Sequence, residues 1–376
     1  MNDKLSALER ELQDNYPFYQ KADLPYQAFT DLPIIDKKTI NAQRDQFERP
    51  NLGKVYESFT SGTTGIPFRC IKTPEENTKL TMAIYKHRRK WGLPLRHQMM
   101  LLSNRFLAEE KMLAHYYKQL HDTGAHMLQG RLSQLYEIAV YIREHALPIP
   151  PSLLFLQNWG EPVQPSQKRV VEEVFGVPLV DYYGMEELWC IAFSNEKGEL
   201  EVDESLVYLE VVDPQTGEPL PAGEYGEVLV TSHVMRSLPY VRYRTGDLGK
   251  LHRDAETGSL ILSLMPVRYS QIRLPERRFQ VAIFRYLDRF FYEMHQKNGV
   301  RQFQMVQETL TSFRLLVAGD EGMEVECLTG KLKALLTQCL GTPVDLVIEV
   351  VPSIAPHPIS GKYQSFVSLV EQGGES

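Results

Sequence analysis

The segment LLFLQNWGEPVQPSQKRVVEEVFGVPLVDY, residues 153–182, decides the fold that we expect. The apolar run at 153–156 predicts a buried strand, the stretch at 165–175 has the spacing of an amphipathic helix, and PLVDY at 178–182 predicts a second strand. This order of strand, helix and strand predicts two parallel strands whose connecting helix packs on one face of the sheet.

Segments with similar patterns precede this unit. We expect strands at 54–59, 68–72 and 99–102, and helices at 3–14, 36–47, 74–91, 108–120 and 132–145. Two of these helices have a clear start signal. Asp36 is placed to cap the second, and Thr73, Pro74 and Glu76 form a capping box with proline at the first helical position. The alternation of strands and helices up to residue 182 predicts a mostly parallel sheet.

The pattern changes twice after that sheet. Short strands between turns at about 200–264 predict an antiparallel β subdomain. Beyond residue 266 the expected order is helix, strand, strand, helix, strand, which suits a compact sheet with helices on one face. We therefore expect an α/β protein with a large N-terminal domain, 1–265, and a small α+β C-terminal domain, 266–376.

Composition narrows the class of protein. With 41 basic and 48 acidic residues the formal net charge is −7, which argues against nucleic-acid binding. The four cysteines form no C-x-x-C pair, so we expect a reducing cytoplasm rather than a disulfide framework or zinc motif. Charges near the N-terminus argue against a secretion signal, and no apolar run approaches the roughly 20 residues of a membrane helix.

Residues 60–65, Thr-Ser-Gly-Thr-Thr-Gly, lie between two expected strands. Their hydroxyl groups and unobstructed backbone N–H groups could surround an anion. The same residue types are also common in hairpin turns. Composition alone therefore leaves two interpretations open, an anion-binding loop and a plain turn.

With Ile66 and Pro67 added, this loop resembles the phosphate loop of adenylate-forming enzymes, a family of acyl-CoA synthetases, adenylation domains and luciferases. Three further segments resemble family motifs in the family's order: Tyr183-Gly184-Met185-Glu186-Glu187, Tyr243-Arg244-Thr245-Gly246-Asp247 and Ser360-Gly361-Lys362. The stretch at 209–232, LEVVDPQTGEPLPAGEYGEVLVTS, is most similar to phenylacetate-CoA ligases and their relatives in capsular-polysaccharide clusters. The resemblance thus extends over most of the chain.

This resemblance implies binding positions for ATP. The loop residues that would hold its phosphates are Thr60, Ser61, Gly62, Thr63, Thr64 and Gly65. The residues that would form the rest of the nucleotide site are Gly160, Glu161, Tyr183, Gly184, Asp247 and Arg268. Among these, Tyr183 would stack on adenine and Asp247 would accept hydrogen bonds from the ribose hydroxyls.

The resemblance also implies catalytic positions and a pocket for the acid. Thr64, Glu187 and Lys362 would act in catalysis, Glu187 by coordinating Mg²⁺ and Lys362 by offsetting charge as one anion attacks another. The pocket walls would include Trp159, Tyr182 and Met185. The C-terminal domain would be the lid over this site.

Three positions depart from the family pattern. Phe68 stands where many relatives have lysine, and Glu186 replaces the usual threonine or serine, which places a second carboxylate beside Glu187. At the domain joint the family has Gly-Arg-x-x-Asp, whereas residues 266–271 read PVRYSQ and keep only Arg268. A joint that begins with Pro266 and lacks the glycine should be stiffer.

The implied function is ATP-dependent activation of a small carboxylic acid as acyl-AMP, with transfer to a thiol, most simply coenzyme A. An alternative acceptor is the phosphopantetheine of a carrier protein or an amine, which the altered joint favours. A second alternative is a nucleotide-binding relative that has lost catalysis. We expect a cytoplasmic enzyme that binds neither nucleic acid nor membrane, and a homodimer stays open.

Overall fold

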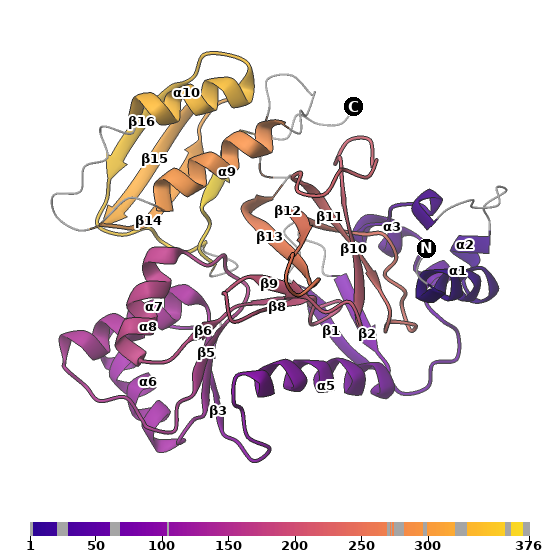
Figure 1. The fold of residues 1–376 in the computed structure, drawn as a ribbon, viewed down its shortest axis with the longest axis horizontal. Coiled ribbons are helices and arrows are strands. Elements are labelled where there is room, and N and C mark those ends of the chain that lie inside the picture. The colour runs from indigo at the N-terminus through magenta and orange to yellow at the C-terminus, as the bar shows by residue number, and fades with distance from the viewer. Residues whose placement is uncertain are drawn as a thin grey trace.

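A computed structural model of the 376-residue chain gives the fold. It describes residues 3–20, 29–60, 68–103, 105–268, 271, 273, 282–295, 299–319, 329–357 and 362–370. The described strands form a hairpin, a four-stranded parallel sheet, a seven-stranded sheet and a four-stranded C-terminal sheet (Figure 1). The mixed α/β class that we predicted is confirmed, although the largest sheet is antiparallel rather than parallel.

The N-terminal segment consists of short helices packed beside the first strands. Their bounds are α1 Asp3–Asn15, α2 Pro17–Gln20, η1 Phe29–Asp31, α3 Lys37–Ala42 and α4 Arg44–Phe47. Asp36 caps α3 as predicted, because its Oδ1 accepts a hydrogen bond from the Thr39 N–H at 2.7 Å. The helix predicted over 36–47 is interrupted at Gln43, whose backbone is not helical. The cap places Lys37 in the first turn of α3.

An antiparallel hairpin follows, and then the longest helix among the described residues. The hairpin strands are β1 Tyr56–Thr60 and β2 Phe68–Lys72, and the helix is α5 Pro74–Lys90. The predicted capping box is confirmed, since Thr73 and Glu76 exchange hydrogen bonds between side chain and backbone. Residues 61–67, which contain Ser61, Gly62, Thr63, Thr64 and Gly65, lie outside the described residues.

The parallel sheet has the order β3-β4-β5-β6 with α6, α7 and α8 between its strands. The bounds are β3 Met99–Leu101, α6 Glu110–Asp122, β4 Met127–Gly130, α7 Leu132–Glu144, β5 Phe155–Asn158, α8 Pro165–Phe175 and β6 Leu179–Val180. The sequence analysis missed β4, because its MLQG is short and contains two residues that are poor strand formers. The predicted parallel pairing is confirmed.

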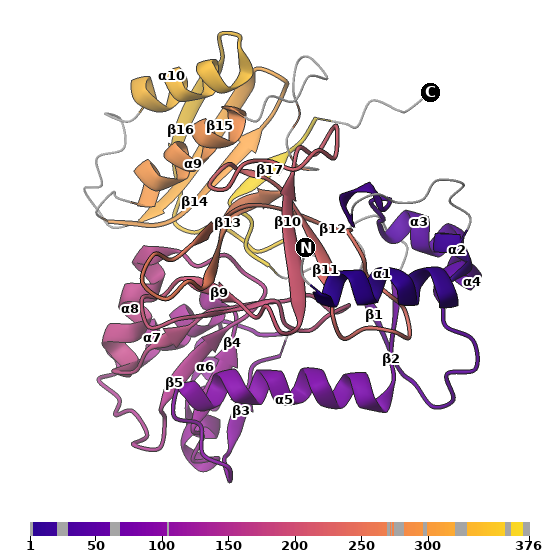
Figure 2. The same ribbon diagram turned by 45° about the vertical axis from the view of Figure 1, so that its right-hand side comes forward.

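Both faces of the parallel sheet are covered, as is usual for such sheets. Leu128 and Leu156 pack with residues of α6, α7 and α8, whereas Met127 and Phe155 pack with residues at the end of α5. Figure 2 shows α5 running alongside the sheet, on the opposite side from α7 and α8. The side chains of Gln129 and Gln157 are on the α5 side, because alternate residues of a strand share a face.

The antiparallel subdomain is larger than predicted. Its strands are β7 Tyr182–Tyr183, β8 Ala192–Ser194, β9 Leu200–Val202, β10 Val207–Val212, β11 Gly226–Ser232, β12 Tyr243–Arg253 and β13 Leu260–Arg268, in the order β10-β11-β12-β13-β9-β8-β7. The strand β12, which contains the Tyr-Arg-Thr-Gly-Asp motif, was not predicted. The register of β12 against β13 shifts between Asp247 and Gly249, so the motif lies at an irregularity of the sheet.

The C-terminal part has the predicted α+β pattern plus one strand that was not predicted, β17. Its elements are α9 Ala282–His295, β14 Val300–Gln307, β15 Ser312–Gly319, α10 Thr329–Leu340, β16 Asp345–Val350 and β17 Phe366–Ser368. Both helices pack on one sheet face, where Phe290 and Leu335 join Phe303 and Leu315 in one apolar core. Since β13 continues through residue 265 without a break, the boundary at 265/266 stays a prediction.

Glu76 connects the start of α5 to the loop after β11. Its carboxylate is 5% exposed and accepts four hydrogen bonds. Oε2 accepts from the Thr73 N–H and the Ser237 hydroxyl, each at 2.7 Å, and Oε1 accepts from the N–H groups of Arg236 and Ser237. Every partner is a donor, so both oxygens are needed as acceptors.

We expect Glu76→Gln to lower the free energy of unfolding by about 2–3 kcal/mol, because the amide NH₂ group would face buried donors. Urea unfolding followed by circular dichroism measures this as a lower midpoint with an unchanged slope. Glu75→Gln is the matched control, since Glu75 is in the same turn but is exposed and pairs only with Lys79. Equal midpoints for the two variants would contradict the expectation.

Candidate active site

The segments that follow the four parallel strands gather at one edge of the sheet. Ser103 comes shortly after β3, Arg131 directly after β4, Trp159 directly after β5 and Asp181 directly after β6. In α/β proteins, ligands usually bind outside the carboxyl ends of parallel strands. Gly160, Glu161, Tyr182 and Tyr183 continue from two of these ends, so several of the predicted site residues lie at this edge.

Tyr183, Asp247 and Arg268 form one connected group at this edge. The Tyr183 hydroxyl donates a hydrogen bond to Asp247 Oδ2 at 2.9 Å, and Arg268 Nε lies 2.8 Å from Asp247 Oδ1. Burial and the Asp247 charge raise the pKa of Tyr183 well above its usual value, and Asp247 raises that of Arg268. Three predicted positions from β7, β12 and β13 are thus in direct contact.

A second group surrounds the buried carboxylate of Glu187, which is 1% exposed. Glu187 Oε1 accepts a hydrogen bond from the Tyr243 hydroxyl at 2.9 Å and lies 3.0 Å from Lys37 Nζ. Lys37 Nζ also donates to the Thr60 hydroxyl at 3.4 Å. Lys37 therefore connects the end of β1, where the predicted phosphate loop begins, to the predicted magnesium ligand.

Gly184 is needed by the close approach of another backbone segment. A Cβ atom at this position would lie 1.8 Å from the carbonyl oxygen of Trp189, and the Tyr182 hydroxyl donates to the same oxygen. Glycine therefore makes room for the turn that carries Glu187. Tyr182 and Met185, which we predicted as pocket walls, pack against the large apolar core of the N-terminal part.

Lys362 reaches the same edge from the C-terminal part. Its Nζ would lie 3.2 Å from a Cβ at Gly160, whose φ of +72° favours glycine. The next residue, Tyr363, donates its backbone N–H to Glu161 Oε1 at 2.9 Å. The predicted neighbours Gly160 and Glu161 are thus both in contact with the segment that carries the predicted catalytic lysine.

Several charged groups act on Lys362. It keeps an exposed surface, but the crowding of its ammonium by protein atoms, followed by the positive charges of Arg268 and Arg131, lowers its pKa. The carboxylates of Asp247 and Glu161 act in the opposite direction. Two further cations and two carboxylates therefore act on the Lys362 ammonium, and the surplus of positive charge is suited to a bound anion such as a phosphate.

A cavity of about 320 Å³ opens beside Trp159 and is lined by Leu101, Leu102, Ser103, Gln129 and Trp159. This supports Trp159 as a pocket wall, whereas Tyr182 and Met185 do not line the cavity. The Trp159 Nε1 atom is buried and has no hydrogen-bond partner within the described ranges. An orphaned donor beside a cavity is what a bound polar ligand would satisfy.

Gln129 in this cavity is oriented by Arg88 of α5. Arg88 donates from Nη2 to Gln129 Oε1 and from Nε to Gln157 Oε1, each at 2.9 Å. Burial lowers the pKa of Arg88. Because a guanidinium group only donates hydrogen bonds, the side-chain oxygens of Gln129 and Gln157, and not their NH₂ groups, must face Arg88. The NH₂ group of Gln129 is therefore directed away from Arg88.

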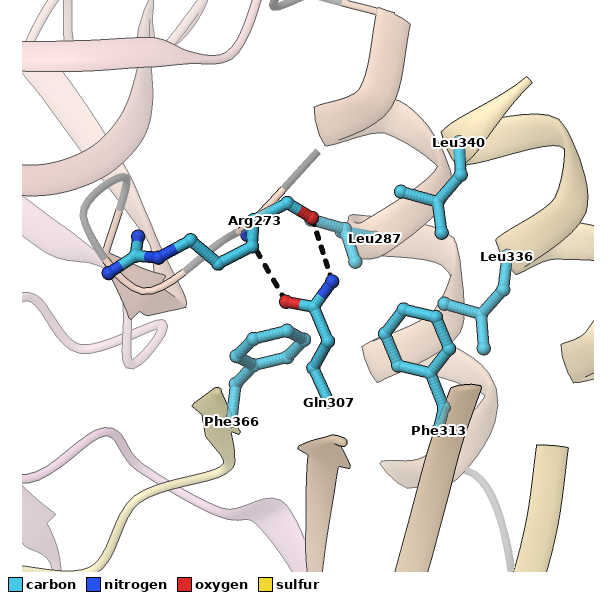
Figure 3. Close-up of a pocket in the computed structure, with 7 residues that line it drawn as sticks. All are labelled: Arg273, Leu287, Gln307, Phe313, Leu336, Leu340 and Phe366. Carbon is cyan, nitrogen blue, oxygen red and sulfur yellow. Dashed lines mark hydrogen bonds between the residues drawn. The ribbon is translucent and has the colours of Figure 1, made fainter. Parts of the chain in front are cut away.

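A second, smaller cavity lies inside the C-terminal part (Figure 3). Its volume is about 10 Å³, near the minimum for one water molecule, so it cannot hold a substrate. Beside it, the Gln307 side chain donates to the Arg273 carbonyl at 2.7 Å and accepts from the Arg273 N–H at 3.1 Å. These bonds hold Arg273 against Gln307 at the end of β14.

Comparison with known proteins relates part of this chain to a family. A family model described as AMP-binding enzyme matches residues 97–237. A phenylacetate-coenzyme A ligase of Pseudomonas putida is 38% identical over 96 residues, which are 24% of this chain and 22% of that protein. Residues 97–237 are thus similar to AMP-binding enzymes. The Thermus thermophilus phenylacetate-coenzyme A ligase, 38% identical over 115 residues, 30% of this chain and 25% of that protein, supports the phenylacetate-CoA ligase branch.

The matched segments span about a quarter of the length of these curated relatives. Solved adenylate-forming structures share the fold over much more of the chain. A 2-hydroxyisobutyryl-CoA ligase in its postadenylation state has a TM-score of 0.70 at 17% identity, covering 97% of this chain and 88% of that one. The same ligase in its thioesterification state gives 0.60 over the same shares. Both comparisons show the same overall fold.

The amide bond synthetase McbA from Marinactinospora thermotolerans is a second solved protein with a similar fold. It has a TM-score of 0.56 at 19% identity and covers 81% of this chain and 67% of its own. Among the described residues, no helix combines the length and apolar character needed to cross a membrane. No group of three potential metal-ligating side chains occurs in the described ranges either.

The sequence analysis missed Lys37, Arg131 and Gln129 as site residues. Lys37 follows a helix cap, Arg131 precedes a helix and Gln129 lies in a strand that was not predicted, so none stands in a recognised motif. The carboxyl end of β4 is the signal that would have found Arg131, once β4 itself was known. Each of these residues becomes a site residue through contacts with distant segments.

We expect Gly184→Ala to lower the free energy of unfolding by about 3 kcal/mol or more, because the new methyl group would collide with a backbone carbonyl. Gly330→Ala is the control, since nothing lies within 4 Å of its Cβ position and α10 should gain helix propensity. Chemical denaturation measures both variants. A Gly184→Ala protein as stable as the wild type would contradict this account of the turn.

Proposed function

We propose that the chain activates a small carboxylic acid with ATP, forming acyl-AMP and pyrophosphate, and then transfers the acyl group to coenzyme A. The observation that carries the proposal is the position of Lys362 beside Gly160, close to the connected Tyr183, Asp247 and Arg268. The match of residues 97–237 to AMP-binding enzymes and the similarity to phenylacetate-coenzyme A ligases support it.

In the first step, a carboxylate oxygen of the acid attacks the α-phosphorus of ATP, and the bond to the bridging oxygen of the β-phosphate breaks. Lys362, with Arg131 and Arg268 nearby, stabilises the negative charge that gathers at the α-phosphate. Asp247 accepts hydrogen bonds from the ribose hydroxyls, and Tyr183 stacks on adenine. In the second step, the thiol of coenzyme A attacks the acyl carbon and AMP leaves.

The residues present fit a magnesium ion that accompanies ATP. Mg²⁺ is usually held by one or two carboxylates together with substrate phosphates, and Glu187 offers one buried carboxylate close to Thr60 and the predicted phosphate loop. The ion would neutralise phosphate charge as pyrophosphate leaves. Lys37, which contacts both Glu187 and Thr60, would bind the phosphates from the other side.

The cavity beside Trp159 is the proposed acid site. Its volume of about 320 Å³ is at the lower end for ligand pockets, which favours a small aryl or short acyl acid. Leu101 and Leu102 provide apolar walls, and Gln129 provides a donor. We infer that the preferred acid has an apolar body and a hydrogen-bond acceptor away from its carboxylate.

An amine or a carrier-protein phosphopantetheine is the second candidate acceptor. The altered joint favours it: residue 273 is fastened to Gln307, and Met265 and Val267 are buried in the C-terminal core. A joint held in this way resists rotation of the C-terminal part between two steps. The carrier protein, a homodimer and the cytoplasmic location stay predictions.

We expect Lys362→Ala to lower acid-dependent ATP–pyrophosphate exchange by about 10²–10³-fold, because it removes the cation at the reacting phosphate. Asp247→Ala should also lower exchange, mainly by raising the KM for ATP. Lys333→Ala, an exposed lysine that contacts Asp345, is the control and should leave exchange unchanged. Absence of exchange with every aryl, fatty and amino acid would reject the proposal and favour a nucleotide-binding relative without catalysis.

We expect Gln129→Leu to raise the KM of the preferred acid by about tenfold, because one hydrogen bond to the acid is lost. The KM for ATP should stay within about twofold, since Gln129 lies in the acid cavity rather than beside Asp247. Steady-state kinetics with the best acid from the exchange screen measures both constants. Unchanged acid KM in a folded variant would remove Gln129 from the acid site.

A further inference from the structure

Glu161 joins two segments that are far apart in the sequence. It follows β5 at the carboxyl edge of the parallel sheet, and its side chain is buried, with 7% of the residue exposed. Its Oε1 accepts the backbone N–H of Tyr363 at 2.9 Å, and its Oε2 accepts the backbone N–H of Ser133 at 3.1 Å. One carboxylate thus connects the start of α7 to the residue after Lys362.

The chemistry of these contacts requires a carboxylate. Both partners are backbone N–H groups, which only donate, so both oxygens must accept. A glutamine has one acceptor and one donor, and one of the two N–H groups would then face an NH₂ group. The negative charge is also favoured at the N-terminus of α7, where Ser133 is in the first turn. Asn158 steadies Glu161 by donating to its carbonyl at 2.8 Å.

Lys362 is held on the C-terminal side by other hydrogen bonds. The His357 N–H donates to the Lys362 carbonyl at 2.9 Å, the Phe303 N–H donates to the Tyr363 hydroxyl at 3.0 Å, and the Met305 N–H donates to the Ser365 carbonyl at 2.8 Å. These bonds fix the segment to its own sheet. They do not reach the edge where Gly160 meets the lysine ammonium, but the bond from Tyr363 to Glu161 does.

We propose that Glu161 is a positioning residue that holds Lys362 at the reacting phosphate, rather than a ligand of the nucleotide. Each of its carboxylate oxygens accepts one backbone N–H, so the contacts of Glu161 in the structure are those of a residue that holds two segments together. The proposal rests on the proposed function, because it assigns Glu161 a task in the adenylation step. The contact of Glu161 with the Tyr363 backbone does not depend on catalysis and can be tested separately.

Other contacts keep the C-terminal part in place when Glu161 is changed. The Tyr225 hydroxyl donates to Asp288 at 2.8 Å, and Arg285 pairs with Glu224. Val267 of β13 is buried in the apolar core of the C-terminal sheet. We therefore expect Glu161→Gln to fold and to loosen the contact at Tyr363 selectively.

The experiment compares Glu161→Gln, Lys362→Ala and the double variant in ATP–pyrophosphate exchange. Glu161→Gln should lower kcat by about 10–100-fold with the KM for ATP within about twofold, because a small misplacement of a catalytic group has effects of this size. In the Lys362→Ala background, Glu161→Gln should have no further effect. Glu172→Gln is the matched control: it is isosteric, it removes only an i,i+4 pair with Lys168, which is about a third exposed, and its amide oxygen can still accept the Leu179 N–H.

Hydrogen exchange of the peptide at 362–370 provides a readout that needs no catalysis. Glu161→Gln should increase amide exchange in this peptide, whereas Glu172→Gln should not. Two results would overturn the proposal in favour of direct nucleotide binding by Glu161. One is unchanged amide protection of the 362–370 peptide in Glu161→Gln. The other is a double variant whose loss of kcat equals the product of the losses in the two single variants. If the wild type shows no exchange of pyrophosphate with any acid, the proposed function fails, and hydrogen exchange alone decides whether Glu161 holds the segment.

Discussion

The four parallel strands β3 to β6 end at one edge of their sheet, and the candidate site depends on this constraint. Parallel pairing aligns the carboxyl ends of all strands, so the residues that follow them must come together whatever their separation in the chain. Arg131, Trp159 and Asp181 reach the edge for this reason. The antiparallel strands β12 and β13 then place Asp247 and Arg268 opposite that edge.

Two carboxylates of the site are paired with cations before any nucleotide enters. Glu187 is paired with Lys37, and Asp247 with Arg268. A buried carboxylate is costly unless it has such partners, and the cations are held in position by the same contacts. An incoming polyphosphate therefore meets positive groups that are already oriented, which reduces the reorganisation needed when charge develops at the α-phosphate.

Local signals predicted much of the fold. The helix α8 has the bounds of the predicted stretch, and the caps at Asp36 and Thr73 form as expected. The missed strand β4 has a clear physical reason. β4 is hydrogen-bonded on both sides, to β3 and β5, so these partners stabilise a short stretch whose residues have low strand propensity.

The sequence by itself determined which residue type stands at each motif position, because a glycine, a carboxylate or a lysine is identified directly from the sequence. Only the tertiary structure decided their partners. Lys37 contacts Glu187, and Glu161 accepts the Tyr363 N–H, through packing of separate sheets. A hydrogen bond acts over about 3 Å, so a side chain's partner depends on which distant backbone is brought that close, and neighbours in the sequence do not specify it.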